Sequence, residues 1–115
     1  MKEYQLQKAV IKWINLKYPR MLYCASAGGV RTSFTQAKRM KATGYVKGFP
    51  DLFIYEPKGS YNGLAIEIKT LKGRASISQI DWINKLEERG YFAKVCKGFE
   101  EVSQTIETYM QLNEN

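Results

Sequence analysis

The chain of 115 residues contains no histidine, and its two cysteines are Cys24 and Cys96. The absence of histidine excludes Ser-His-Asp and Cys-His catalysis, zinc sites that contain histidine, and an imidazole general base. Two cysteines are too few for a zinc ribbon or a disulfide framework. We therefore expect both cysteines to be small buried apolar residues of a protein in a reducing compartment.

Long hydrophobic runs are also missing. No apolar stretch approaches the ~20 residues of a membrane-spanning helix, and the start MKEYQLQKAV lacks the apolar block of a signal peptide. We therefore expect a cytoplasmic protein with no membrane partner. A length of 115 residues suits one hydrophobic core, so residues 1–115 are expected to form a single domain.

Acidic residues are nearly absent from the first part of the chain. Residues 1–50 hold ten Lys and Arg and one acid, Glu3, whereas residues 51–115 hold eight basic and ten acidic residues. With a net charge of +7, this asymmetry favours a surface for a polyanion, nucleic acid before membrane. The alternative is a solvated basic face that only aids solubility.

Apolar periodicity predicts an amphipathic helix over residues 2–17, which Pro19 ends, and a strand over 20–26 followed by a turn at Gly28 and Gly29. A short basic helix is expected over 33–42. Strands over 52–56 and 64–70 flank a turn sequence, PKGSYNG, and are predicted to form an antiparallel hairpin.

The second part of the chain predicts a helix, a strand and a closing helix. The first helix, over 76–89 with a stop at Gly90, carries Ile77, Ile80, Ile83 and Leu86 on one side. After a strand over 91–97, the last helix is expected to bury apolar residues, namely Phe99, Val102, Ile106, Tyr109 and Met110. Trp13 and Trp82 are expected to pack in the core.

The strand–helix–strand unit over 64–97 should be a right-handed crossover with parallel strands. Together with the hairpin, it predicts an α/β fold, in which a mixed central sheet is flanked by helices.

Three charged residues stand out on this scaffold. Asp51 opens one strand of the hairpin, and Glu67 and Lys69 lie inside the other. Because side chains alternate along a strand, Glu67 and Lys69 share one face. The hairpin can bring Asp51 beside Glu67, and two converging carboxylates suit Mg²⁺, with a lysine to stabilise charge on a phosphate. The alternative is an ordinary surface ion pair with Asp51 as a turn residue.

The stretch KGFPDLFIYEP followed by LAIEIKTLKGRASISQ resembles the virus-type replication-repair nuclease (VRR-NUC) domain. This family belongs to the PD-(D/E)xK nucleases, with a restriction-endonuclease-like αβββαβ core. The resemblance extends over nearly the whole chain, from Glu3 to the closing helix. It implies a phage or bacterial nuclease that leaves 5′-phosphate ends.

By this resemblance, Asp51, Glu67 and the Ile68 carbonyl would bind Mg²⁺ or Mn²⁺, and Lys69 would be the catalytic lysine. Gln79 matches the glutamine that completes the catalytic site, and Glu3 matches an acid that reaches the metal. Both have structural alternatives. Gln79 also fits a capping box with Ser76, and an acid in a first helical turn is favoured by the helix dipole.

The remaining basic residues predict contacts with DNA. Lys72 and Arg74 directly follow the catalytic strand and are expected at the mouth of the site. Lys38, Arg39, Lys41 and Lys47 precede Asp51 and are expected to contact the duplex backbone, with most of the basic residues on one face.

These observations together predict a metal-dependent DNA endonuclease. Compact members of the family resemble Holliday-junction resolvases, so we expect a homodimer that acts on branched DNA, such as a four-way junction. The alternatives are a nucleic-acid-binding module without catalysis, and a nickase or exonuclease that acts on simple duplex DNA.

Overall fold

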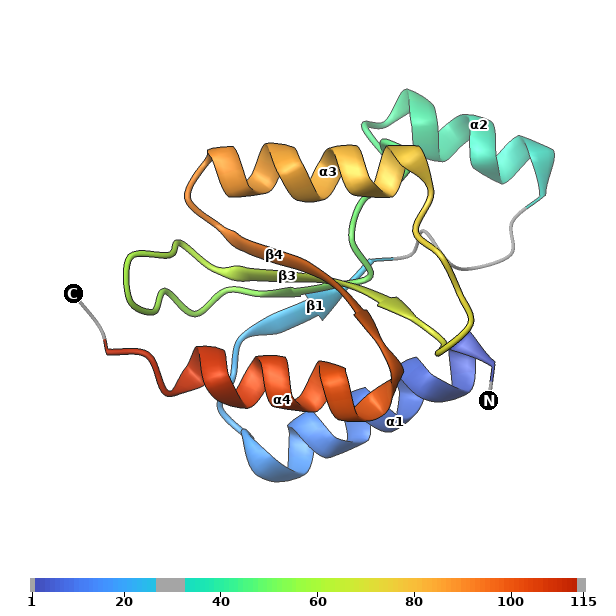
Figure 1. The fold of residues 1–115 in the computed structure, drawn as a ribbon. Coiled ribbons are helices and arrows are strands. Elements are labelled where there is room, and N and C mark those ends of the chain that lie inside the picture. Colours follow the sequence, from blue (N-terminus) through green and yellow to red (C-terminus); the bar gives the residue numbers. More distant parts are fainter. Residues whose placement is uncertain (1, 27–32, 114–115) are drawn as a thin grey trace.

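A computed structural model describes residues 2–26 and 33–113 and contains the predicted elements in the predicted order (Figure 1). The elements are α1 (Glu3–Lys17), β1 (Tyr23–Ala25), α2 (Phe34–Ala42), β2 (Leu52–Ile54), β3 (Leu64–Lys69), α3 (Ile77–Glu88), β4 (Phe92–Lys97) and α4 (Gly98–Met110). The turn predicted at Gly28 and Gly29 lies outside the described residues. None of the described helices combines the length and apolar character that a membrane span requires.

The strands form one mixed sheet in the order β1-β2-β3-β4. β2 pairs antiparallel with β1 and with β3, while β3 pairs parallel with β4. The predicted hairpin, the parallel pairing of the strands on either side of α3 and the α/β architecture are therefore confirmed. Figure 1 shows that α1 and α4 cover one face of the sheet and α3 covers the other.

The central strand β3 is buried along all six residues because helices pack on both of its faces. Leu64, Ile66 and Ile68 belong to the larger apolar core, which also contains residues of α1 and α4. Ala65 belongs to the smaller core with Ile83 of α3. The period of two along a strand therefore places Glu67 and Lys69 on the face that α3 covers.

All four strands are shorter than the sequence predicts, β3 and β4 by one residue and β1 and β2 by more. β2 ends at Ile54, and beyond it the backbone carbonyl of Glu56 accepts the hydroxyl of Tyr109, on α4, at 2.6 Å. Pro57 then has no N–H to donate to a ladder. β1 covers only Tyr23–Ala25, although the N–H of Ser26 still donates to the Asp51 carbonyl at 2.9 Å.

Cys96 is buried as predicted, but Cys24 is exposed, so the prediction for Cys24 is wrong. Cys24 pairs with Phe53, whose side chain packs in the smaller core. Directly paired residues point to the same face, so Cys24 lies on the α3 side of the sheet. Since α3 packs on β3 and β4, it does not cover the edge strand β1.

The predicted buried face of α3 is only half correct. Ile83 and Leu86 are buried, whereas Ile77 and Ile80 have exposed fractions of 89% and 47%. Steps of three residues fall short of a 3.6-residue turn, so a row at i, i+3, i+6 and i+9 rotates around the helix.

Most of the other core predictions hold. Val102, Ile106 and Tyr109 of α4 are buried. Phe99 is 38% exposed, contrary to prediction, and Met110 packs only partly buried against the core. Both tryptophans, Trp13 and Trp82, pack against the cores as expected.

Candidate metal centre

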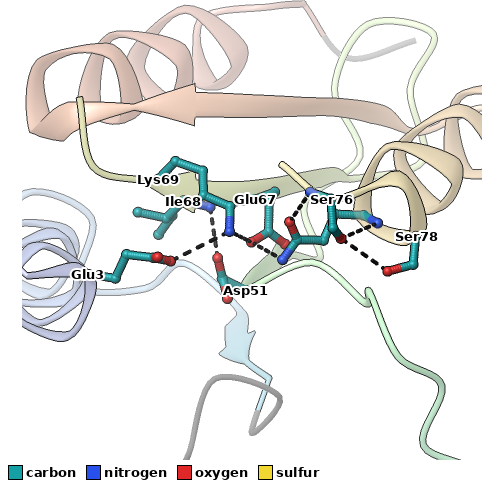
Figure 2. Close-up of polar contacts among 8 residues, drawn as sticks. Glu3, Asp51, Glu67, Ile68, Lys69, Ser76 and Ser78 are labelled. Carbon is teal, nitrogen blue, oxygen red and sulfur yellow. Dashed lines mark hydrogen bonds and ion pairs between the residues drawn. The ribbon is translucent and has the colours of Figure 1, made fainter. Parts of the chain in front are cut away.

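Three carboxylates from three different elements converge at one end of the sheet (Figure 2). Glu3 begins α1, Asp51 precedes β2 and Glu67 lies in β3. One carboxylate oxygen of each residue lies within 4.8 Å of the oxygens of the other two. The side chains that the sequence singled out as metal ligands therefore come together.

Asp51 is positioned by the register of the hairpin. Leu52 pairs with Ile66, so the next position along each strand places Asp51 opposite Glu67. The Oδ2 atom of Asp51 accepts the backbone N–H of Ile68 at 2.8 Å. Because the N–H and C=O of one strand residue point to the same side of the strand, the Ile68 carbonyl also faces the β2 side.

Glu3 is held near the sheet by the first turn of α1. The side chain of Gln5 accepts the backbone N–H of Lys2 at 3.0 Å, which satisfies one donor at the start of the helix. The Glu3 side chain is 54% exposed and points toward Asp51 and Lys69 (Figure 2). A helix dipole alone does not account for this direction, because the Glu3 carboxylate also contacts another element.

Lys69 lies between two of the carboxylates. Its Nζ is 3.7 Å from Oε2 of Glu67 and 3.8 Å from Oε1 of Glu3. The Lys69 side chain is only 11% exposed, so its charge is largely removed from water. This geometry differs from a surface ion pair, in which both partners are solvated.

Glu67 is 1% exposed, and its Oε1 atom has no hydrogen-bond partner among the residues that the structure describes. Burial is the main cause that raises the pKa of the Glu67 carboxyl to about 9. The neighbouring Asp51 carboxyl adds to this rise, and the Lys69 charge opposes it. A buried carboxylate with a free oxygen is costly unless a cation or a proton compensates it.

Gln79 forms a hydrogen bond to the helix start and another to the metal-centre cluster. Its Oε1 accepts the backbone N–H of Ser76 at 2.8 Å, as in a capping box. Its Nε2 donates to Oε2 of Glu67 at 3.1 Å. The amide is therefore held at both ends, and it orients the carboxylate of Glu67.

A cavity of about 180 Å³ opens onto this cluster. Its lining consists of Glu3, Tyr45, Lys47, Gly48, Phe49, Asp51, Glu67, Ser76, Ser78 and Gln79. Tyr45, Phe49 and Ser78 are lining residues that the sequence did not predict. The sequence feature that could have indicated this wall is the glycine at position 48. In the structure Gly48 has φ +95° and lies against the backbone of Ser78.

The residues of this cluster fit a hard divalent cation. Mg²⁺ and Mn²⁺ prefer oxygen ligands, and the cluster offers three carboxylates and a carbonyl that faces them. The unpartnered Oε1 of Glu67 is the clearest sign, because a bound cation would satisfy it.

The predicted DNA-contacting residues are all exposed. Lys38, Arg39 and Lys41 lie on α2, which buries none of its residues. Lys72 and Arg74 lie in the turn between β3 and α3. Figure 1 shows α2 and this turn at the same end of the molecule as the start of α1.

Comparisons with known proteins agree with the geometry. The sequence profile of the VRR-NUC domain matches residues 1–100. A solved structure described as a "VRR_NUC domain protein" is 29% identical, with a TM-score of 0.84, and the match covers 99% of this chain and 92% of that one. No curated protein matches the chain. The chain therefore belongs to the VRR-NUC family and is a nuclease-type DNA-processing domain.

Proposed function

We propose that this protein is a divalent-metal-dependent DNA endonuclease that hydrolyses phosphodiester bonds. The observation that carries the proposal is the unpartnered Oε1 of the buried Glu67, within 4.8 Å of two further carboxylates and beside a buried lysine. In this proposal Asp51, Glu67 and the Ile68 carbonyl hold Mg²⁺ or Mn²⁺, and Glu3 adds a ligand directly or through water.

Each neighbouring residue has a defined chemical part in hydrolysis. A bound divalent cation supplies a water of lowered pKa and positive charge near the scissile phosphate. Lys69 provides a second positive charge, which stabilises the charge that develops on the phosphate in the transition state. Gln79 holds the Glu67 carboxylate in orientation through its hydrogen bond of 3.1 Å.

The exposed basic residues support binding to the DNA backbone. Lys47 lines the cavity of the metal centre, where it lies close enough to contact the substrate strand. The residues Lys38, Arg39, Lys41, Lys72 and Arg74 extend this positive surface beyond the cavity. Because these side chains contact phosphates, we expect DNA affinity to fall steeply as salt increases.

We further propose that the substrate is branched DNA and that the protein acts as a homodimer. A two-fold dimer presents two equivalent metal centres, which matches the symmetry of a four-way junction. The resemblance of compact VRR-NUC domains to Holliday-junction resolvases supports this choice.

The decisive experiment compares cleavage of a labelled four-way junction with cleavage of a matched duplex, with and without Mg²⁺ or Mn²⁺. Wild type should cut the junction only with metal, and Lys69→Ala should lower the rate by about 100-fold or more. Lys85→Ala is the matched control, because Lys85 is exposed and pairs with Asp81 on α3. We expect Lys85→Ala to cleave like wild type.

Other outcomes separate the parts of the proposal. Salt-sensitive DNA binding without cleavage in any metal would contradict the nuclease and favour a binding module. Equal cleavage of duplex and junction would contradict branch selectivity alone. A monomer in sedimentation at low and moderate salt would contradict the dimer and leave the metal-dependent hydrolysis intact.

A further inference from the structure

A second cavity, of about 460 Å³, lies at the ends of β3 and β4, and the metal centre does not use it. It is lined by Leu6, Thr70, Leu71, Lys72, Gly98 and Phe99. None of these residues lines the cavity of the metal centre. Its volume falls in the range of about 300–1,000 Å³ that is typical of small-molecule sites.

Leu71 and Phe99 form an apolar part of the lining of this second cavity, and each contacts a neighbouring residue. Leu71 is 77% exposed, yet its side chain leans on Gly98, where an added Cβ would come within 2.9 Å of Leu71 Cδ2. Phe99 is 38% exposed and meets Trp13 edge to face, with ring centroids 6.2 Å apart. A leucine and a phenylalanine thus remain exposed to solvent in a defined arrangement.

The second cavity lies next to the reacting centre. Leu71 follows Lys69 by two residues, in the turn after β3, so their Cα atoms are at most about 7 Å apart. On α1, Leu6 lies one turn beyond Glu3, on the same side of the helix. Figure 1 shows the turn after β3 close to the start of α1. A nucleotide adjacent to a phosphate at the metal centre could therefore reach this cavity.

The charge around the second cavity matches a nucleic acid. Lys72 belongs to its lining, and Lys97 and Arg74 lie beside it in the sequence. None of these three forms an ion pair with a residue that the structure describes. A two-fold contact between copies through this cavity would bring Lys72 of each copy together, which like-charge repulsion disfavours.

From this arrangement we propose that the second cavity binds an unpaired nucleobase of the substrate, next to the phosphodiester that is cleaved. The base stacks on Phe99, Leu71 forms the opposing apolar wall, and Lys72 contacts the adjacent phosphate. The inference rests on the proposed function and deepens it, because it names how a branch point is distinguished from duplex: a base at a branch point leaves its pair and its stack at a lower cost than a base inside a duplex.

The test uses 2-aminopurine, a base whose fluorescence rises when it leaves the DNA stack. A four-way junction carries it at the nucleotide beside the cut, and a duplex carries it at an internal pair. Binding is measured in metal-free buffer, so the signal does not depend on cleavage. We expect a rise with wild type on the junction and at least a fivefold smaller rise with Leu71→Ala and with Phe99→Ala.

Leu16→Ala is the matched control, because Leu16 is 78% exposed and lies at the far end of α1. It should give the wild-type signal. Leu71→Ala removes an exposed side chain and therefore tests the cavity without destabilising the fold. For Phe99→Ala, a thermal melt checks that the variant is folded. In metal, the ratio of junction to duplex cleavage should fall about tenfold in Leu71→Ala and remain at the wild-type value in Leu16→Ala.

The inference is overturned if wild type binds the junction without a rise, or if both cavity variants keep the full rise. It is also overturned if Leu71→Ala converts a dimer into a monomer, because the second cavity would then be a contact between copies. A normal rise in wild type without any metal-dependent cleavage would contradict the proposed nuclease and support the base-binding cavity.

Discussion

The side-chain amide of Gln79 connects the start of α3 to the buried carboxylate of Glu67, to which it donates over 3.1 Å. The other end of the same amide accepts the backbone N–H of Ser76 at 2.8 Å. A residue that caps a helix therefore also positions a candidate metal ligand. Loss of the Gln79 amide should therefore lower stability through the lost cap and lower activity through the lost hydrogen bond to Glu67.

For Gln79→Ala, we predict that the cleavage rate or the Mn²⁺ affinity falls by about 10–100-fold, because Glu67 loses the hydrogen-bond donor that orients it. The control is Gln36→Ala, since Gln36 forms the same type of capping box with Ser33 on α2. Both variants should lose about 1 kcal/mol or less of stability. An equal effect of the two variants on Mn²⁺ affinity would contradict a positioning role for Gln79.

Metal binding should depend strongly on pH. The pKa of the Glu67 carboxyl is raised from 4.5 to about 9 in the metal-free protein, so binding must displace a proton at neutral pH. We predict that Mn²⁺ affinity rises between pH 5 and about 9, and that calorimetry in buffers of different ionisation enthalpy detects the released proton. Glu88→Gln, at an exposed site, should retain this dependence.

The same carboxyl predicts how the stability of the metal-free protein changes with pH. Between pH 4.5 and about 9 the unfolded chain has lost the Glu67 proton and the folded chain retains it. Unfolding then releases a proton, so the free energy of unfolding should fall as pH rises through this window. Denaturant melts in EDTA should show that Glu67→Gln removes this decrease of the free energy of unfolding with pH. An unchanged pH dependence would contradict a raised pKa at Glu67.

Asp51→Asn should stabilise the metal-free protein while it abolishes metal-dependent cleavage. An asparagine oxygen can still accept the N–H of Ile68, and the substitution removes a negative charge beside Glu67. We expect a gain of about 1 kcal/mol, or about 4 °C in Tm, measured in EDTA above about pH 9, where both carboxyls are ionised and repel each other. The control Asp81→Asn loses an exposed ion pair with Lys85 and should change stability by less than about 0.5 kcal/mol. A lower Tm for Asp51→Asn would argue against repulsion at this site.

The wall of the metal-centre cavity depends on Gly48. With φ +95°, an alanine there would place its Cβ 2.7 Å from the backbone of Ser78. Gly44 provides a comparison, because it has φ +109° and nothing within 4 Å of an added Cβ. Thermal unfolding should show a loss of about 1–2 kcal/mol for Gly44→Ala, from backbone strain, and clearly more for Gly48→Ala. Equal losses would mean that the contact with Ser78 is readily relieved.

Much of the candidate site could be predicted because it depends on local geometry. The alternation along β3 places Glu67 and Lys69 on one face, and a short hairpin places Asp51 opposite Glu67. The exposure of Cys24 could not be predicted in this way, because it depends on which strands α3 covers. The apolar row that includes Ile77 misled the prediction, since its spacing of three residues does not follow a single helix face.

The amino-acid sequence by itself determined the order of the elements, the pairing of the hairpin and the identity of the charged residues on β3. These features follow from periods of 2 and 3.6 residues and from turn chemistry, all of which act between near neighbours in the chain. Only the tertiary structure decided that Glu3 meets Lys69, that Glu67 retains an unpartnered oxygen, and that Leu71 and Phe99 stay exposed together. Each of these depends on how segments distant in sequence pack, because packing sets which groups lose water and which atoms come within reach of one another.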